Sequence, residues 1–226
     1  QTNAPKPSTS IPSDLLEKMR REFQYWYPMD LRVSGKDLIG NHLTMCLYNH
    51  AAIWPNESET RWPRSMYTNG FVLLDGDKMS KSTGNFLMLD EACELYSADA
   101  VRFALADAGD SLEDANFERK RADSAVTMLF VEEIFARAAM RDPTVGKKDQ
   151  LQLRDGELSY FVDRAFKNEL GAMIAETLAC YEGMRWRDGI QAGAFGLQLL
   201  RDAYRDWCAK SGVPMHQGLL VDYARV

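Results

Sequence analysis

The sequence of 226 residues has few of the residues that build disulfide frameworks and zinc sites. Its four cysteines are widely spaced, and no Cys-x-x-Cys pair occurs. Neither structural zinc nor disulfide bonds are therefore indicated, and a reduced, intracellular protein is the simplest expectation. No apolar run is long enough to span a bilayer, and no basic stretch followed by an apolar one opens the sequence as in a signal peptide. We expect no membrane partner, and we assign no metal-binding residues.

The sequence also lacks an excess of positive charge. The sequence has 27 Lys and Arg against 33 Asp and Glu, a formal net charge of −6. A stand-alone nucleic-acid-binding module usually carries a basic excess, so a nucleic-acid partner would meet only local basic patches. One candidate patch is the run Arg119-Lys120-Arg121, which opens a predicted helix and is most commonly a solvated face.

Apolar periodicity divides the sequence into an α/β part and an all-α part. Residues 1–13 are rich in Pro, Ser and Thr and are predicted to be a linker. Residues 14–117 predict helices over 14–26, about 36–53, 89–96 and 98–106, with strands over 31–33 and 71–74 and an irregular segment over 54–64. Residues 118–226 predict helices over 118–140, 157–182 and 187–209 and the start of a fourth at 219–223. We interpret residues 118–226 as a helical bundle that is incomplete.

The clearest helical period lies in residues 157–182. The apolar stripe of this segment includes Phe161, Phe166, Leu170, Leu178 and Tyr181. A stripe of this kind requires partner helices. Trp186 and Trp207 are predicted to lie in the same core.

The segment 77–85, Asp-Lys-Met-Ser-Lys-Ser-Thr-Gly-Asn, carries the strongest chemical signal. Lys78 and Lys81 can bring two ammonium groups to a polyphosphate. Two lysines in a polar loop are, taken alone, more commonly a solvated turn. The segment directly follows the predicted strand 71–74, and ligands of open α/β sheets gather near strand ends.

Neighbouring residues suit the same chemistry. Ser80 and Ser82 add hydroxyl groups that can donate hydrogen bonds. Gly76 and Gly84 allow the backbone to bend sharply on either side of the lysines. A second, weaker signal is the strand–Gly–helix join at Gly35, which is the geometry of a nucleotide-binding βα turn.

Residues 78–82 spell KMSKS, and Thr-Gly-Asn follows. This string resembles the second signature of class I aminoacyl-tRNA synthetases. Segments 23–43, 68–73, 96–102, 106–110 and 114–117 resemble leucyl-tRNA synthetases of the eukaryotic cytosolic and archaeal type. The resemblance is dense over about residues 14–120 and looser beyond. It implies that residues 14–117 form the C-terminal half of a Rossmann-like catalytic domain and that 118–226 belong to an anticodon-binding-type helical bundle.

The resemblance also implies site residues. In this family the KMSKS loop binds the ATP triphosphate, so Lys81 is the leading candidate for phosphate contact, and Lys78 would assist it and stabilise the closed loop. The ATP-binding positions implied are Gly35, Asp37, His42, Asn69, Gly70, Phe71, Val72, Met79, Ser80 and Ser82.

The polar members of this set have alternatives. Asp37 either accepts hydrogen bonds from ribose hydroxyls or is an acidic residue favoured by the helix dipole. His42 either lines the nucleotide and amino-acid pocket or is structural. Residues 69–72 match a segment whose exposed backbone amides and carbonyls meet the adenine.

The first signature of the class, His-Ile-Gly-His, is not found. The only histidines are His42, His50 and His216, and no two of them have that spacing. The editing insertion and the tRNA-binding C-terminal extension of the family are not found either. The resemblance therefore implies a fragment that begins after the editing insertion and ends inside the anticodon-binding domain. Such a fragment requires the N-terminal half of the catalytic domain, because both halves surround the α-phosphate in the transition state.

The function implied is that of the parent enzyme: ATP-dependent activation of leucine to leucyl-adenylate and transfer of the leucyl group to tRNA(Leu). Mg²⁺ would accompany ATP, held mainly by phosphates and water. One alternative is an isoleucyl- or valyl-tRNA synthetase. Another is a non-catalytic, synthetase-derived module that binds tRNA or protein. The missing first signature favours this module, and the intact lysine loop disfavours it.

Overall fold

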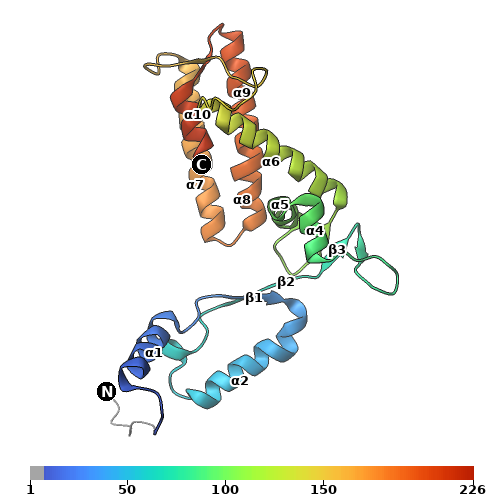
Figure 1. Ribbon diagram of the computed structural model, residues 1–226, viewed down its shortest axis with the longest axis vertical. Helices are drawn as coiled ribbons and strands as arrows, with labels where there is room; N and C mark the ends of the chain where they lie inside the picture. Colours follow the sequence, from blue (N-terminus) through green and yellow to red (C-terminus); the bar gives the residue numbers. More distant parts are fainter. Residues whose placement is uncertain (1–7) are drawn as a thin grey trace. The chain divides into compact units, whose positions relative to one another are not determined.

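The computed structural model describes residues 8–226, which divide into two compact units (Figure 1). Unit 1 comprises the described residues up to Asn69, and unit 2 runs from Gly70 to Val226. Of the predicted linker, residues 1–7 lie outside the described residues, and residues 8–12 precede the first helix. The predicted domain boundary after residue 117 remains a prediction.

Unit 1 contains four helical segments of α or 3₁₀ type, one π-helical segment and two strands within its described residues. In chain order these are α1 Ser13–Trp26, β1 Arg32–Gly35, the 3₁₀ helix η1 Lys36–Leu38, the π helix η2 Ile39–Leu43, α2 Thr44–Ile53, α3 Ser58–Arg61 and β2 Met66–Asn69. Strands β1 and β2 pair in parallel, with Gly35 opposite Asn69. The predicted helix 36–53 is therefore helical throughout, but it is α-helical only from Thr44.

Aromatic side chains hold α1 and α2 together within unit 1. The ring of Tyr27 stacks on Phe23 at 4.8 Å between centroids and on His50 at 5.8 Å. The Nδ1 atom of His50 lies 2.7 Å from the carbonyl oxygen of Cys46, so Nδ1 carries the proton and Nε2 accepts from the Tyr27 hydroxyl. His50 is thus a buried structural residue.

Unit 2 contains a three-stranded sheet and most of the helices. Its elements are β3 Val72–Leu74, β4 Asp77–Lys78, α4 Leu89–Tyr96, α5 Ala98–Ala108, β5 Ala115–Phe117, α6 Arg119–Ala139, β6 Leu153–Arg154, α7 Phe161–Glu182, α8 Trp186–Ile190, the π helix η3 Gln191–Gly196, α9 Leu197–Lys210, β7 Met215–His216 and α10 Gln217–Ala224. Strand β3 lies between β4, which is antiparallel to it, and β5, which is parallel.

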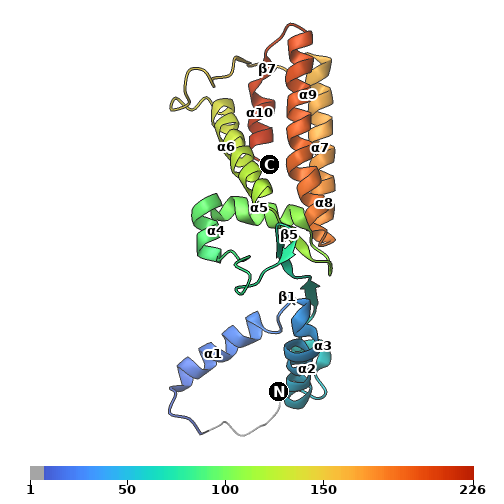
Figure 2. The same ribbon diagram turned by 90° about the vertical axis from the view of Figure 1, so that its right-hand side faces the viewer.

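Two apolar clusters form the core of unit 2. The first joins the sheet to α4, α5 and the start of α6, and it includes Leu74, Tyr96 and Phe117. The second lies among α6, α7, α9 and α10, which run side by side in Figure 2, and it includes Phe166 and Tyr204. The fold is therefore mixed helix and sheet followed by packed helices.

Several sequence-based predictions of detail are wrong. The predicted helix 157–182 begins only at Phe161, and the predicted helix 187–209 is divided by η3. Trp186 and Trp207, predicted to be core, are 38% and 36% exposed. Only part of the stripe is buried, because Phe161, Leu178 and Tyr181 are exposed. Segment 54–64 is not wholly irregular, since it contains α3.

Replacing Phe166 with alanine should lower the free energy of unfolding by roughly 3 kcal/mol, because a fully buried ring would leave a cavity. Phe166 has no exposed surface, and its ring stacks on Tyr204 at 4.3 Å. Urea unfolding would measure the change. Phe161→Ala is the matched control on the same helix: Phe161 is 77% exposed, and its loss should cost less than about 0.5 kcal/mol. Equal midpoint shifts for both variants would contradict this assignment of the core.

Candidate functional site

The lysine loop begins with a tight hairpin. Strands β3 and β4 pair with Leu73 opposite Lys78 and Leu74 opposite Asp77, so the two-residue turn is Asp75-Gly76. Both turn residues have positive φ, 51° and 92°. Asp-Gly is a preferred sequence for two-residue hairpin turns that require positive φ at both positions. Strand β4 ends at Lys78, and the turn before it sets the direction in which β4 runs.

Beyond β4 the chain closes into a hydrogen-bonded loop. The Ser80 amide donates to the carbonyl of Asn85 at 2.8 Å, and the Gly84 amide donates to the carbonyl of Lys81 at 3.3 Å. The Thr83 hydroxyl donates to the Ser80 carbonyl at 3.2 Å. Gly84 has φ 73°, which a side chain would disfavour. The expected bends at Gly76 and Gly84 are thus present.

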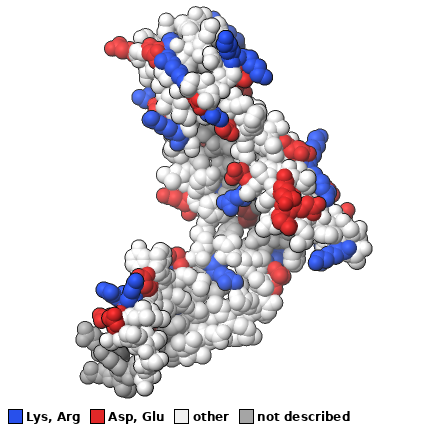
Figure 3. Space-filling model, in the orientation of Figure 1, with Lys and Arg blue, Asp and Glu red and all other residues white. Residues whose placement is uncertain are grey.

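Both lysines of the loop are exposed. The Lys78 ammonium lies 5.9 Å from the centroid of the Phe71 ring, within the range of a cation–π contact. Among residues 8–226 no carboxylate pairs with the Lys81 ammonium. Figure 3 shows basic atoms at the edge of unit 2 where Figure 1 places this loop, with acidic atoms gathered near them. Lys81 can therefore offer its charge to an anion.

The residues between the lysines differ in role. Met79 is half-buried and packs against the apolar cluster of Leu74 and Phe117, so its side chain holds the loop to unit 2. The Ser80 and Ser82 hydroxyls lie 2.8 Å apart and are hydrogen-bonded to each other. Asn85, which the sequence-based site omitted, donates from its side chain to the Leu74 carbonyl at 3.3 Å.

A second group of predicted residues lies at the carboxyl ends of β1 and β2. Their parallel register places Gly35 beside Asn69, two residues that the prediction took from separate segments. A Cβ atom on Gly35 would stand 2.6 Å from the Asp37 carboxylate, so a side chain there would displace Asp37 from its present position. Asp37 lies in η1, and His42 lies in η2; both are exposed. π-helical turns such as η2 are frequent at functional sites.

The predicted adenine-facing segment is partly corrected. Gly70 is buried, and a Cβ atom on it would stand 2.1 Å from the carbonyl oxygen of Glu113. Its amide donates to the Ser111 carbonyl at 3.0 Å, and the Phe71 amide donates to the Asp114 carboxylate at 2.9 Å. These two amides are therefore not exposed as predicted, because the returning chain before β5 occupies them. Val72 lies within β3.

The basic run at the start of α6 is largely neutralised. Arg119 pairs with Asp75, and Arg121 pairs with Glu118 at 3.1 Å and with Asp107 at 3.4 Å. Two of its three cations therefore contact carboxylates of unit 2.

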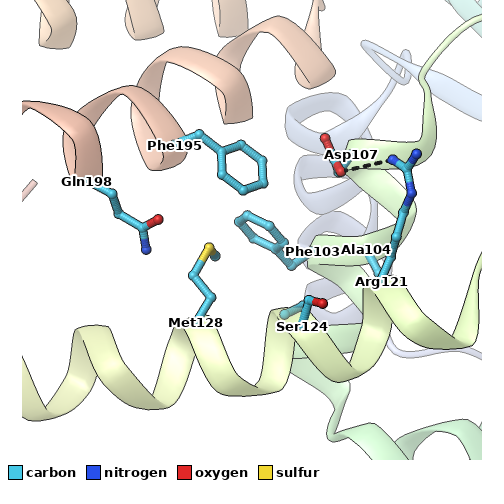
Figure 4. Close-up of a pocket in the computed structure, with 9 residues that line it drawn as sticks. Phe103, Ala104, Asp107, Arg121, Ser124, Met128, Phe195 and Gln198 are labelled. Carbon is cyan, nitrogen blue, oxygen red and sulfur yellow. Dashed lines mark hydrogen bonds and ion pairs between the residues drawn. The ribbon is translucent and has the colours of Figure 1, made fainter.

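The larger cavity described in unit 2 lies away from the predicted ATP residues. It has a volume of about 380 Å³, and Figure 4 shows Phe103 of α5 and Phe195 of η3 beside each other in its lining, in edge-to-face contact with ring centroids 5.6 Å apart. Asp107 and Arg121 form an ion pair at one side. None of the predicted ATP-binding residues lines this cavity.

Within residues 8–226 there is no group of three or more His, Cys, Asp or Glu side chains arranged to hold a metal ion. Of the helices in the part of the chain that the structure covers, none is sufficiently long and apolar to traverse a bilayer.

Residues 9–135 match the family model described as "tRNA synthetases class I (M)". This match covers more than half of the chain and includes β1, β2 and the lysine loop. The class is thus that of the class I tRNA synthetases, as the KMSKS string predicted.

Curated relatives narrow the class to one family. The chain is 44% identical over 218 residues to the cytoplasmic leucine–tRNA ligase of Neurospora crassa, covering 96% of the chain and 18% of that protein. It is 43% identical to the cytoplasmic enzyme of Pongo abelii, covering 99% of the chain and 18% of that protein. It is 40% identical to the leucine–tRNA ligase of Aeropyrum pernix, covering 96% and 21%. The chain belongs to the leucine–tRNA ligase family, of the eukaryotic cytoplasmic and archaeal type, and spans about a fifth of the length of these relatives.

Solved structures share the fold. A LeuRS–tRNA–LeuAMS complex from Agrobacterium radiobacter K84 aligns with a TM-score of 0.64 at 18% identity, over 87% of this chain and 24% of that one. Mycobacterium tuberculosis methionyl-tRNA synthetase with methionyl-adenylate aligns with a TM-score of 0.59 at 19% identity, over 95% and 41%. At these identities the likeness concerns the fold alone.

Proposed function

We propose that the protein to which this chain belongs is a leucine–tRNA ligase of the cytoplasm. It would use ATP to convert leucine to leucyl-adenylate and then transfer the leucyl group to tRNA(Leu). The observation that carries the proposal is a lysine loop with exposed ammonium groups, within a chain 40–44% identical to leucine–tRNA ligases over nearly its whole length. The names of these relatives do not favour isoleucyl- or valyl-tRNA synthetase.

Lys81 is assigned to the ATP phosphates. Its ammonium group meets no carboxylate in residues 8–226, so it can contact the phosphates, where negative charge develops in the transition state. Lys78 would assist from the end of β4, where the Phe71 ring supports it. Ser80 and Ser82 can redirect their shared hydrogen bond towards a phosphate oxygen.

The ends of β1 and β2 are assigned to the nucleoside. Ligands of open parallel sheets bind at the carboxyl ends of strands, where Gly35 and Asn69 lie side by side. The exposed carboxylate of Asp37 can accept hydrogen bonds from ribose hydroxyls. His42 is one helical turn further and is assigned to the same pocket. Gly70, Phe71 and Val72 are assigned to the adenine, and the exposed ring of Phe71 is the group among them that can meet it.

Magnesium is assigned to ATP itself. Mg²⁺ prefers oxygen ligands, retains several waters and commonly binds through substrate phosphates. The two lysines would then neutralise the part of the triphosphate charge that the metal leaves.

The two parts of the chain have separate assignments. Residues 14–117 would be the C-terminal half of the catalytic domain, and residues 118–226 would belong to an anticodon-binding-type helical bundle that meets tRNA(Leu). The N-terminal half of the catalytic domain would supply the first signature. Because reacting groups must be held from both sides, the chain alone should lack activity.

Leucine-dependent exchange of pyrophosphate into ATP tests this proposal. The full-length protein should catalyse exchange with leucine far faster than with isoleucine or valine, and residues 1–226 alone should show none above background. Exchange driven by isoleucine or valine would replace the amino-acid assignment. Absence of exchange with all three, in a folded full-length protein that still binds tRNA, would favour the non-catalytic module. Exchange by the isolated chain would contradict the requirement for the other half.

A further inference from the structure

The turn that opens the lysine loop is hydrogen-bonded to residues 40 to 44 positions further along the chain. The Asp75 amide donates to the Phe117 carbonyl at 3.0 Å, and the Gly76 amide donates to the Asn116 side-chain oxygen at 2.7 Å. In return, the Arg119 amide donates to one carboxylate oxygen of Asp75 at 3.0 Å, and the Arg119 guanidinium pairs with the other. Both amides of the turn and both carboxylate oxygens of Asp75 are therefore engaged by residues 116–119.

Asp75 performs two tasks that few residues combine. Its φ of 51° is in the left-handed region, which Asp, Asn and Gly adopt more readily than other residues. Its carboxylate also accepts from the first amide of α6, one of the amides that an α-helix leaves without an internal partner. A negative group at this end is favoured by the helix dipole. Glycine would satisfy the turn but not the helix, and alanine would satisfy neither.

The rest of the loop has few such contacts. Beyond β4 its hydrogen bonds lie mostly within residues 80–85, with one from the Asn85 side chain to the Leu74 carbonyl. Apart from the packing of Met79 against the apolar cluster, the position of Lys78 and Lys81 therefore depends on the Asp75-Gly76 turn, which sets the direction of β4. Misplacement of a reacting group by about 1 Å can cost two orders of magnitude in rate.

We propose that Asp75, assisted by Asn116, is a positioning residue of the reaction: it holds the lysine loop in the position and direction that the activation of leucine by ATP requires. The inference rests on the proposed function, since it assigns a role to the same loop. It adds residues that the KMSKS string does not contain. The positioning acts through the turn geometry and the hydrogen bond to α6; the ion pair with Arg119 is exposed, and pairs of this kind contribute little.

The test uses the full-length protein and four variants. Asp75→Ala removes both tasks, whereas Asp75→Asn keeps the positive φ and a side-chain oxygen for the α6 amide. Asn116→Ala removes the acceptor of the Gly76 amide together with the side-chain hydrogen bond from Asn116 to Glu118. Asp155→Ala is the matched control, because it breaks an Arg–Asp pair of similar exposure, Arg141–Asp155, at the other end of α6. The 21 residues of α6 separate the two sites by about 30 Å.

We expect Asp75→Ala to lower kcat/KM for ATP about tenfold in leucine-dependent exchange, while KM for leucine stays within about twofold. Asn116→Ala should show a smaller loss of the same kind. Asp75→Asn should retain activity within about threefold, because it restores the turn and the cap, and Asp155→Ala should match the wild type. Hydrogen–deuterium exchange over residues 76–85 should be faster in Asp75→Ala than in Asp75→Asn, whether or not ATP is present.

The outcomes separate this inference from the proposed function. Suppose that the wild type exchanges pyrophosphate. The positioning role is then wrong, while the function stands, if Asp75→Ala has the kcat/KM for ATP of the wild type or if Asp75→Asn loses as much kcat/KM as Asp75→Ala. A parallel rise in KM for ATP and for leucine would indicate general misfolding and would also overturn it. If the wild type shows no exchange, the proposed function fails, and unchanged deuterium uptake over 76–85 in Asp75→Ala would then refute the positioning role independently.

Discussion

Replacing Lys81 with alanine in the full-length protein should slow leucine-dependent pyrophosphate exchange by about 10²–10³-fold. The ammonium group of Lys81 is exposed and has no carboxylate partner in residues 8–226, so its charge is available to the phosphates of ATP. Negative charge shifts between phosphate oxygens as the reaction reaches its transition state. A cation beside these oxygens therefore stabilises the transition state more than the ground state. The loss should therefore appear mainly in kcat, with a smaller rise in KM for ATP.

A control on another exposed lysine separates a specific effect from a change of net charge. Lys148 is exposed in the connection that follows α6, and Lys148→Ala should leave exchange within about twofold of the wild type. Lys78→Ala should lie between the two, since the Phe71 ring already interacts with the Lys78 ammonium. If Lys81→Ala kept exchange within twofold of the wild type, Lys81 would have no part in the chemistry.

Replacing Asp163 with alanine should lower the free energy of unfolding by about 3–5 kcal/mol. Asp163 is fully buried at the start of α7 and accepts hydrogen bonds from the Arg154 guanidinium, the Tyr204 hydroxyl at 2.7 Å and the Tyr160 amide at 3.3 Å. The Tyr204 hydroxyl in turn accepts from the His216 amide at 3.1 Å. Without the carboxylate, Arg154 would be a largely buried cation with no counter-charge.

The same group predicts a dependence of stability on pH. Burial by itself would raise the pKa of Asp163, but hydrogen bonds from Arg154 and Tyr204 and the charge of Arg154 outweigh it, and the pKa lies below its ordinary value. The stabilisation is therefore complete above the unfolded-state pKa of about 4 and is lost as pH falls through the lower, folded-state value. Asp163→Asn does not titrate, so the gap in stability between it and the wild type should narrow in acid.

Urea unfolding at several pH values would measure both effects. Asp155→Ala again serves as the control, because the Arg141–Asp155 pair is exposed and should contribute less than about 1 kcal/mol. A shift for Asp163→Ala no larger than that of the control, or a gap that stays constant from neutral pH into acid, would show that the buried carboxylate does not hold α7, β6 and α9 together.

Sequence periodicity located most long helices because their apolar residues repeat along one face. Periodicity did not predict which side chains are buried, because burial depends on whether another element packs against them. Phe161 and Phe166 belong to one predicted stripe, yet only Phe166 meets Tyr204, and Trp207 is left at the surface. Strands β2 and β5 were not predicted as such, because three or four residues are too short to show a period of two; each is a strand through pairing with a distant segment.

The candidate site shows the same division. The string KMSKS and the Asp-Gly turn are local, and local chemistry was enough to place a cationic loop after a strand. That Gly35 lies beside Asn69 follows from a parallel register that no local pattern contains. The predicted exposed amides of Gly70 and Phe71 are occupied by the chain before β5, which the linear order could not reveal.

The amino-acid order by itself determined the family, the cationic loop with its glycine bends, and the change from mixed structure to helices, because each depends on neighbours within a few positions. Only the tertiary structure decided which side chains are buried, which amides are already bonded, and that Asp75, Asn116 and Arg119 hold the base of the lysine loop. Hydrogen bonds and burial join residues far apart in the chain, so their partners are chosen only when the elements pack.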